Sequence, residues 1–151
     1  MMEKLRFDGS LWCNMDMALR NLDQLYGRVT QAMDLSVVEW YVMRTLMERD
    51  GRHASDLAQA VGRAATSFTP ILDSLERKQL IVRRPDPKDR RAVFIHLTEE
   101  GEALRRRIQS SAEQVETVVR REASKEDWTA FEHVLATLVL LNTDEDPVAA
   151  R

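Results

Sequence analysis

The stretch RRPDPKDRRAVFIHLT, residues 83–98, is strongly basic at its start, although the whole protein carries a net charge of −3. Its first nine residues, 83–91, contain five Lys or Arg, two Asp and two Pro. The short apolar run Leu80–Val82 precedes the stretch, and the β-rich run Ala92–Leu97 lies near its end. Two such runs around a polar segment predict a β-hairpin with a long loop. We expect the strands to separate at the two prolines, because proline cannot donate a ladder hydrogen bond.

The segments before this hairpin predict helices separated by a tight turn. Ser36 and Glu39 have the spacing of a capping box, which begins a helix. A short helix then starts at Ser55 or Asp56 and is closed by Gly62. An apolar face at helical spacing marks the helix that follows the turn. The helices that we expect before the hairpin cover about residues 36–48, 55–61 and 64–78.

Two longer helical segments flank these elements. Residues 10–33 carry two apolar stripes, one at steps of three and four residues and one at steps of seven. A helix that is apolar on two faces is buried from two sides, by its own domain and by a partner. Residues 99–142 contain two further helices, the second beginning at a capping box of Ser124 and Asp127. We expect residues 143–151 to form a loose tail.

Composition and length set the class of the protein. The 151 residues suit one domain, and 44% apolar with 31% charged residues is typical of a mainly helical globular protein. The sequence has no apolar run of the roughly 20 residues that a membrane span needs, and the start MMEKLRFDGS lacks the apolar core of a secretory signal. The single cysteine, Cys13, excludes an internal disulfide. We expect a cytoplasmic protein without a membrane partner.

The charge is distributed unevenly along the chain. Residues 52–91 hold nine Lys or Arg and five Asp or Glu, a local charge of +4, which leaves −7 for the remainder. Nucleic-acid binding requires a local basic surface, and the total charge is a poor measure of it. Two helices around a tight turn, followed by a hairpin with a basic tip, are the elements of a winged helix-turn-helix. One helix can enter the major groove, which is about 12 Å wide, while a cationic loop reaches the minor groove.

The sequence resembles the MarR (multiple antibiotic resistance regulator) family of transcription factors over about residues 10–142. The resemblance is carried by a helix end LERKQLI at 75–81, by RRPDPKDRR at 83–91 and by LTEEG at 97–101. Asp89 and Arg91 match the Asp-x-Arg positions of the family's wing. The resemblance implies a mainly α fold with a small β-hairpin wing. Residues 35–98 would form the DNA-binding lobe, and helices within 10–33 and 99–142 would mainly form a homodimer.

The function implied by the resemblance is that of a regulator of transcription that binds double-stranded DNA. Most such proteins are repressors that bind a palindromic operator, and many release DNA when they bind a small aromatic acid or phenol. Neither the resemblance nor any sequence motif implies a catalytic residue, a cofactor or a metal ion. The DNA-binding residues that we expect are Arg63, Ala65, Thr66, Ser67, Thr69, Arg83, Arg84, Lys88, Asp89, Arg90 and Arg91. Asp89 is expected to brace Arg91 and not to face phosphates.

The sequence departs from the family pattern in the recognition helix. Pro70 and Ser74 occupy positions where the family often carries basic residues. Pro70 also lies inside the expected helix, where it removes a backbone hydrogen bond and can bend the axis. These departures leave open an alternative, a winged helix that binds another protein and does not bind DNA.

Two further sites remain open at this level. Trp12, Met15, Trp40 and Met43 form either an effector pocket or part of the core, since aromatic and Met residues at helical spacing suit both. Cys13 lies in the first turn of a helix, where a thiol can be reactive. We favour an inert interface thiol over a redox sensor, because the negative charge of Asp16, one turn away, disfavours the thiolate that a sensor needs. The three histidines, at 53, 96 and 133, do not show the spacing of a zinc site.

Overall fold

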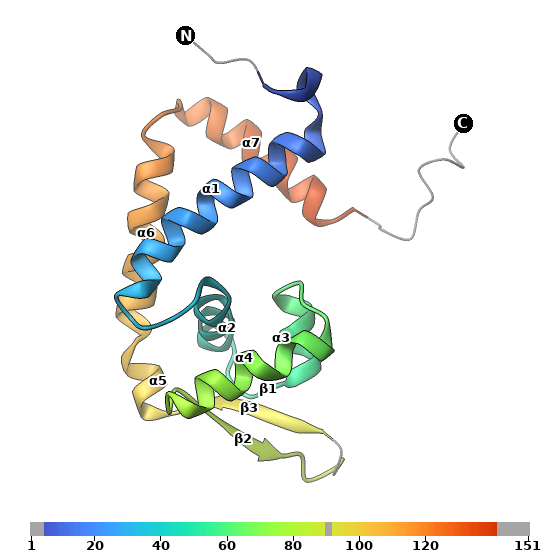
Figure 1. The fold of residues 1–151 in the computed structure, drawn as a ribbon, viewed down its shortest axis with the longest axis vertical. Coiled ribbons are helices and arrows are strands. Elements are labelled where there is room, and N and C mark those ends of the chain that lie inside the picture. Colours follow the sequence, from blue (N-terminus) through green and yellow to red (C-terminus); the bar gives the residue numbers. More distant parts are fainter. Residues whose placement is uncertain (1–4, 90–91, 142–151) are drawn as a thin grey trace, which may run out of the picture. The chain divides into compact units, whose positions relative to one another are not determined.

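The chain forms helices and one small sheet, as the computed structural model in Figure 1 shows. The structure describes residues 5–89 and 92–141, and of residues 65 and 66 only the backbone. The chain divides into two units, Met1–Val115 and Glu116–Arg151, which we describe separately. A short 3-10 turn, η1 (Phe7–Gly9), precedes the helices of the first unit. Those helices are α1 (Leu11–Gln31), α2 (Val37–Glu48), α3 (Ala54–Ala60), α4 (Ala65–Arg77), α5 (Glu99–Ala103) and most of α6 (Arg105–Arg120).

Local sequence signals set the helix boundaries. At the start of α2 the Ser36 hydroxyl accepts the N–H of Glu39 at 3.2 Å, and the Glu39 carboxylate accepts the N–H of Ser36 at 2.7 Å. This capping box confirms the prediction for that helix. At the start of α1, in contrast, the side chain of Ser10 forms no capping bond. Asn14 instead ties the preceding segment to the helix, because its amide oxygen accepts the N–H of Arg6 at 3.0 Å and its amide nitrogen donates to the Ser10 carbonyl at 2.6 Å.

The sheet has three antiparallel strands in the order β1-β3-β2, one more than the sequence predicts. The additional strand, β1 (Arg52–His53), pairs with β3 (Val93–Leu97). Two residues are too few to give a periodic signal, so the sequence could not reveal β1. The pairing of β2 (Ile81–Pro85) with β3 continues to Pro85 opposite Val93 and therefore does not open at the first proline as expected. Pro85 is tolerated because it is the last residue of its strand.

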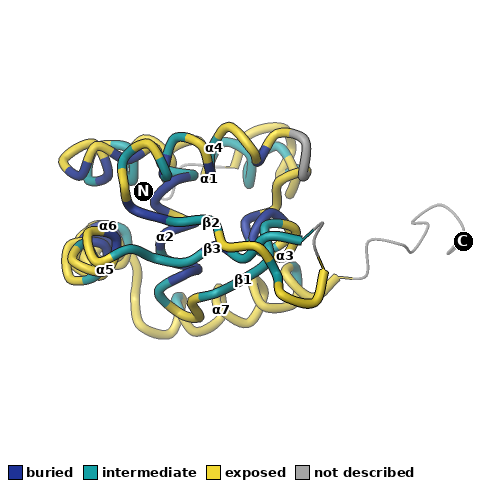
Figure 2. Tube along the Cα trace, turned by 90° about the horizontal axis from the view of Figure 1, so that it is seen from below, coloured by how far each residue is buried: buried dark blue, intermediate teal, exposed yellow. Residues whose placement is uncertain are grey.

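The core of the first unit lies between α2, α4, the sheet and α6. Figure 2 shows buried residues along α2, whereas the strands are mainly intermediate in burial. Burial of one large apolar side chain stabilises the fold by about 1.5–3 kcal/mol, because the side chain is removed from water. The largest fully buried apolar side chains are Val42, Met43, Leu46, Leu57, Phe68, Leu75, Ile81, Ile95 and Ile108.

The first helix after the sheet begins at a close backbone contact. The Thr98 hydroxyl caps α5 by accepting the N–H of Gly101 at 3.0 Å, and the Thr98 N–H donates to the Leu80 carbonyl at 3.1 Å. A Cβ atom on Gly101 would lie 2.1 Å from that same carbonyl oxygen. The expected long helix is interrupted at Leu104, which separates α5 from α6.

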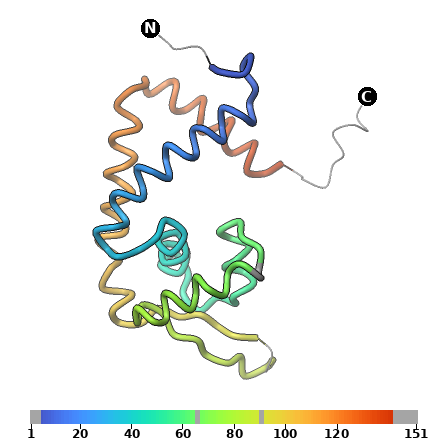
Figure 3. The backbone as a smooth tube through the Cα atoms, viewed as in Figure 1, coloured from blue at the N-terminus to red at the C-terminus, as the bar shows by residue number. Residues whose placement is uncertain are grey.

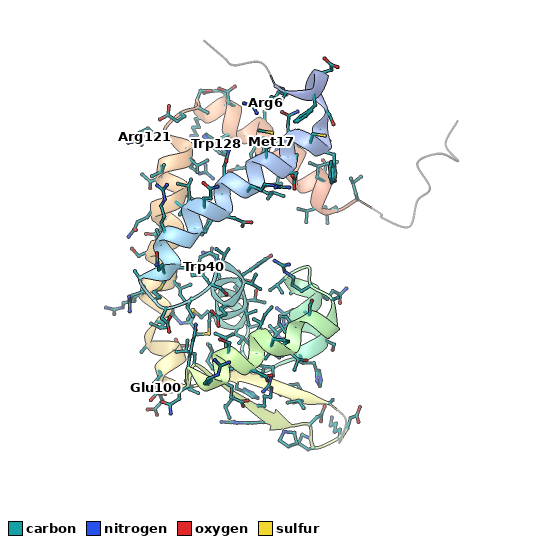
Figure 4. All side chains as sticks on the ribbon, viewed as in Figure 1. Arg6, Met17, Trp40, Glu100, Arg121 and Trp128 are labelled. Carbon is teal, nitrogen blue, oxygen red and sulfur yellow. The ribbon has the colours of Figure 1, made fainter. Side chains whose placement is uncertain are left out.

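The second unit contains the end of α6 and α7 (Lys125–Val139). Ser124 and Asp127 form the predicted capping box at the start of α7. The Arg120 guanidinium lies 5.2 Å from the centre of the Trp128 ring, and its Nη2 is 2.6 Å from the Glu132 carboxylate. Figure 4 labels Trp128 on this helix. No residue of α7 is buried within the described chain, and Figure 2 shows the helix almost entirely exposed.

We predict that Gly101→Ala destabilises the fold by about 1–3 kcal/mol, the usual cost of forcing an atom into a packed site. The Leu80 carbonyl belongs to the backbone and cannot rotate away as a side chain could. Gly27→Ala is the matched control, since Gly27 lies inside α1 and a Cβ there meets nothing within 4 Å. That change should stabilise α1 by about 0.5–1 kcal/mol. Urea unfolding of both variants measures the difference, and equal stabilities would contradict the role of Gly101.

Candidate nucleic-acid interface

A tight turn places α4 against α3. Gly62 has a φ of +64°, a left-handed conformation that L side chains rarely adopt, and it reverses the chain after α3. The N–H of Arg63 then donates back to the carbonyl of Ala58 at 2.8 Å. The turn leaves Arg63 exposed immediately before α4. Figure 3 shows the path of the chain through α3, the turn and α4.

One face of α4 is buried and the opposite face is exposed. Phe68, Leu72 and Leu75 are at most 3% exposed and fix the helix on the core. The helix continues through Pro70 without interruption. The Ser67 hydroxyl donates to the carbonyl of Ala64 at 3.0 Å, so its proton is used locally. Among the side chains of α4 that the structure describes, the exposed ones are Ser67, Thr69, Pro70, Asp73 and Arg77.

Arg83 connects the wing to α4. Its guanidinium lies 2.6 Å from the Asp73 carboxylate and 2.5 Å from the Glu76 carboxylate, both on α4. Burial opposes the charge of Arg83, but the two carboxylates outweigh this effect and raise its pKa. The two carboxylates each use one donor of the guanidinium and offset its charge, and the expected contact of Arg83 with DNA phosphates stays a prediction. Within the described chain, Arg83 acts as a brace between β2 and α4.

A second set of contacts, made by Asp86 with Ala92, Lys88 and His53, fixes the wing loop. The N–H of Asp86 donates to the Ala92 carbonyl at 3.0 Å, which prolongs the hairpin past Pro85. The Asp86 carboxylate accepts the N–H of Lys88 at 2.7 Å and lies 3.6 Å from Nε2 of His53. The His53 ring stacks on Phe94 with 4.1 Å between the ring centres. The short strand β1 therefore supports the wing.

Three of the expected DNA-binding cations are exposed and carry no ion pair within the described part of the chain. They are Arg63, Arg84 and Lys88. Asp89 is also exposed, and its carbonyl accepts the N–H of Ala92 at 2.9 Å. Arg90 and Arg91 lie outside the described residues, as do the side chains of Ala65 and Thr66. The roles expected for these four residues stay predictions.

The four residues considered for an effector pocket lie in different environments. Trp40 and Met43 are core residues, 7% and 0% exposed, and the Trp40 Nε1–H donates to Ser111 Oγ at 2.9 Å. Figure 4 labels Trp40 on α2. Met15 is half-buried, and Trp12 is 77% exposed. For Trp40 and Met43, core packing accounts for the apolar pattern that the sequence shows.

The histidines and Cys13 have simple surroundings. His96 Nδ1 lies 3.1 Å from the Asp50 carboxylate, which also accepts the N–H of Leu97 at 2.8 Å. Burial opposes the ionisation of Asp50, but these hydrogen bonds outweigh it and lower its pKa. Asp50 thus anchors the end of β3. Cys13 is a half-buried free thiol in the first turn of α1. Within the described chain, no group of three or more His, Cys, Asp or Glu side chains could hold a metal ion.

The sequence did not predict the acidic partners of the wing, Asp73, Glu76 and Asp86. The sequence did contain one indication that Arg83 has an acidic partner. Ile81, Arg83 and Pro85 alternate onto the same face of β2, and Ile81 is 2% exposed. A cation on the buried side of a strand requires an acidic partner. That reasoning would have placed a carboxylate beneath the hairpin, but it could not have said which one.

The arrangement is that of a winged helix-turn-helix protein, and comparison with known proteins identifies its family. Residues 35–93 match the model of the MarR family. The homoprotocatechuate degradative operon repressor of Escherichia coli is 28% identical over 113 residues, 75% of this chain and 76% of the relative. The transcriptional regulator HosA of Escherichia coli O111:H- is 32% identical over 98 residues, 58% of this chain and 73% of HosA.

Solved structures show the same fold. One is the transcriptional repressor CouR bound to a 23-mer DNA duplex, with a TM-score of 0.81 and 23% identity over 91% of this chain and 99% of that chain. Another is Bordetella bronchiseptica BpsR, from work on regulation of its DNA binding by 6-hydroxynicotinic acid. Its TM-score is 0.82, with 18% identity over 93% of this chain and 100% of that chain. The chain belongs to the MarR family of transcriptional regulators and is not an enzyme. Every helix in the described residues is too short or too polar to cross a membrane.

We predict that Arg83→Gln lowers the free energy of unfolding by about 1 kcal/mol, a value suited to charged contacts that are partly exposed to solvent. Arg84→Gln is the matched control from the adjacent position of the same strand. It removes an exposed cation without an ion pair and should change stability by less than about 0.5 kcal/mol. Chemical denaturation compares the two variants. If both behaved like the parent protein, Arg83 would not brace the wing.

Proposed function

We propose that the protein is a transcriptional repressor that binds a palindromic DNA operator as a homodimer. The exposed face of α4 would lie in the major groove, and the hairpin loop would follow the adjacent backbone and minor groove. The observation that carries this proposal is the position, on both sides of α4, of cations that form no ion pair among the described residues. Arg63 lies at its start, and Arg84 and Lys88 lie on the wing that Arg83 ties to it.

The chemistry of α4 supports recognition by shape and backbone contacts together with base contacts. The exposed Thr69 hydroxyl can bond to bases or phosphates, whereas Pro70 offers only an apolar surface. The carboxylate of Asp73 would repel phosphates if it stood alone, but Arg83 neutralises it. Arg90 and Arg91 add two further cations to the loop in the sequence. An arginine at the minor groove gains from the focused negative potential there.

A homodimer is supported by apolar surface that a single chain leaves in water. On α7 and just beyond it, Phe131, Val134, Leu135, Val139, Leu140 and Leu141 are 38–82% exposed. On α1, Leu11, Trp12 and Leu19 are 54–77% exposed. Apolar residues gathered on one helix in this way mark an interface. We assign α1 and α7 to the dimer and residues 35–98 to the DNA-binding lobe, with the protein in the cytoplasm.

Release from DNA by a small aromatic or phenolic ligand is the regulation that we propose. The work on BpsR, which concerns regulation of DNA binding by 6-hydroxynicotinic acid, supports this class of ligand. The first relative considered above is named for an operon of aromatic degradation. The core positions of Trp40 and Met43 argue against those two side chains as the ligand's main contacts.

The DNA-binding proposal predicts a steep dependence of affinity on salt. A labelled duplex recovered from genomic fragments by the immobilised protein would be titrated by fluorescence anisotropy at several salt concentrations. Each phosphate contact adds about 0.9 to the slope of log affinity against log salt. Arg84→Gln on both subunits of a dimer should therefore reduce the slope by about 2.

The control for that titration is Arg20→Gln, which removes an exposed cation on α1 that pairs with Asp16. It should leave both affinity and slope unchanged. Recovery of proteins but no DNA, or an affinity that does not change with salt, would contradict the proposal. That result would favour a winged helix that binds another protein.

The dimer proposal predicts a sedimenting mass near twice 17.4 kDa at micromolar concentration. Leu135→Glu introduces a charge into the exposed apolar face of α7 and should shift the protein to monomers, because a buried unpaired charge is costly. Glu126→Gln, in the first turn of α7, is the control and should remain dimeric. A parent protein that sediments as a monomer would exclude a symmetric operator complex.

A further inference from the structure

The exposed face of α4 has an unusual composition for a surface that would lie against DNA. Ser67, Thr69 and Pro70 form its first part, and Asp73 follows about one turn later. The single Lys or Arg of the helix is Arg77, about two turns beyond Pro70. Up to Asp73, the described side chains on this face are therefore hydroxyl groups and the ring of a proline.

Two polar side chains on this face are already engaged within the chain. The Ser67 hydroxyl donates its proton to the carbonyl of Ala64 at 3.0 Å. The Asp73 carboxylate, which has no proton to donate, lies 2.6 Å from the Arg83 guanidinium. Neither side chain therefore offers a free hydrogen-bond donor to the edge of a base.

The surroundings of Pro70 narrow further what this face can contact. Ser74, about one turn later, is half-buried and forms a hydrogen bond with the Glu39 carboxylate of α2. Pro70 itself has no N–H, and its ring carries no polar atom. Thr69, which is exposed beside it, adds a methyl group next to its hydroxyl. The centre of the exposed face is thus apolar apart from one hydroxyl.

This chemistry matches one base better than the others. In the major groove guanine is bound by Arg or Lys, and adenine is bound by Asn or Gln. The helix α4 contains no Lys, Asn or Gln, and its one Arg is the last residue. Thymine instead presents a C5 methyl group, which apolar side chains and the methyl group of threonine can contact.

We propose that Thr69 and Pro70 select a thymine in each half-site of the operator by contact with its C5 methyl group. The inference rests on the proposed function, because it concerns the same DNA complex, and it adds the base that the helix reads. Arg63, Arg84 and Lys88 would contribute affinity through phosphates, and such contacts do not read sequence.

The way α4 is held suits an apolar contact of this kind. On its opposite face Phe68 and Leu72 are 1% and 3% exposed and fix the helix on the core. The ring of Pro70 loses no side-chain freedom when it is covered, so the contact carries no entropic penalty from that side chain. Burial of one methyl group should therefore change the affinity by about fourfold.

The DNA side of the contact is tested by replacing thymine with deoxyuracil, which removes the C5 methyl group and keeps the base pair. Each thymine of the labelled duplex is replaced in turn, and binding is measured by fluorescence anisotropy. At one position we expect about fourfold weaker binding for one half-site and about fifteenfold for both. If no deoxyuracil weakened binding, the inference would be wrong.

The protein side is tested with a variant that carries both Thr69→Ser and Pro70→Ala. Ser keeps the hydroxyl and loses the methyl group, and Ala removes most of the ring, so circular dichroism should show an unchanged fold. The preference of this variant for thymine over deoxyuracil should fall from about fourfold to less than about twofold. A preference that stayed at its full value would show that other residues read the methyl group.

Arg84→Gln is the matched control for this comparison. It removes an exposed cation of the wing, so it should weaken binding to both duplexes and leave the preference for thymine over deoxyuracil unchanged. Loss of the preference in this control as well would show that the preference follows overall affinity and not the contact with α4, and the assignment to Thr69 and Pro70 would fall.

A last pair of duplexes separates the methyl group from the rest of the base. Cytosine and 5-methylcytosine, placed opposite guanine at the sensitive position, differ in this methyl group alone. The methylated duplex should bind about fourfold more tightly, and equal binding would contradict the contact. If the protein binds no duplex at all, the proposed function fails and the inference with it. If the duplex binds but deoxyuracil has no effect, the inference alone fails.

Discussion

The carbonyl of Leu80 is the point at which the two strands of the wing and the start of α5 meet. It accepts the N–H of Thr98 at 3.1 Å and lies against Gly101, where even a methyl group would not fit. The Thr98 hydroxyl donates to the Gln79 carbonyl at 2.6 Å and also caps α5. The end of α4, the first strand of the wing, the last strand and the start of α5 are thereby held at one place. The short motif LTEEG thus has a structural reason that does not depend on contact with DNA.

Ion pairs fix two further contacts, that of the wing with α4 and that of α4 with α2. Arg83 holds the wing against α4, and Lys78 holds the end of α4 near Glu39 of α2. Burial of Glu39 opposes its ionisation, but hydrogen bonds from Ser74, Ser36 and Lys78 outweigh this and lower its pKa. A carboxyl whose pKa is lowered by folding adds stability above its ordinary pKa and loses it as the pH falls through the lower, folded value. The relative position of α2 and α4 is therefore sensitive to acid and insensitive near neutral pH.

The sequence predicted those features that are encoded locally. The capping boxes at Ser36 and Ser124, the turn at Gly62 and the apolar face of α4 each depend on residues a few positions apart, and each was found. Features that depend on distant partners were missed. The strand Arg52–His53 exists only because Phe94 and Ile95 offer it a sheet edge, and the acidic partners of Arg83 come from a different element. For the same reason, charge counting along the chain could not separate Arg83, which is neutralised, from Arg84, which is not.

This separation between paired and unpaired cations also marks the surface of the wing that we consider functional. Arginines that brace the fold, such as Arg83 and Arg105, have their carboxylates within the chain. The cations at the wing, Arg84 and Lys88, are left without one among the described residues. At an exposed position an unpaired cation costs little, because water solvates it, so it can persist until a partner arrives. At the wing that partner would be the extended phosphate backbone.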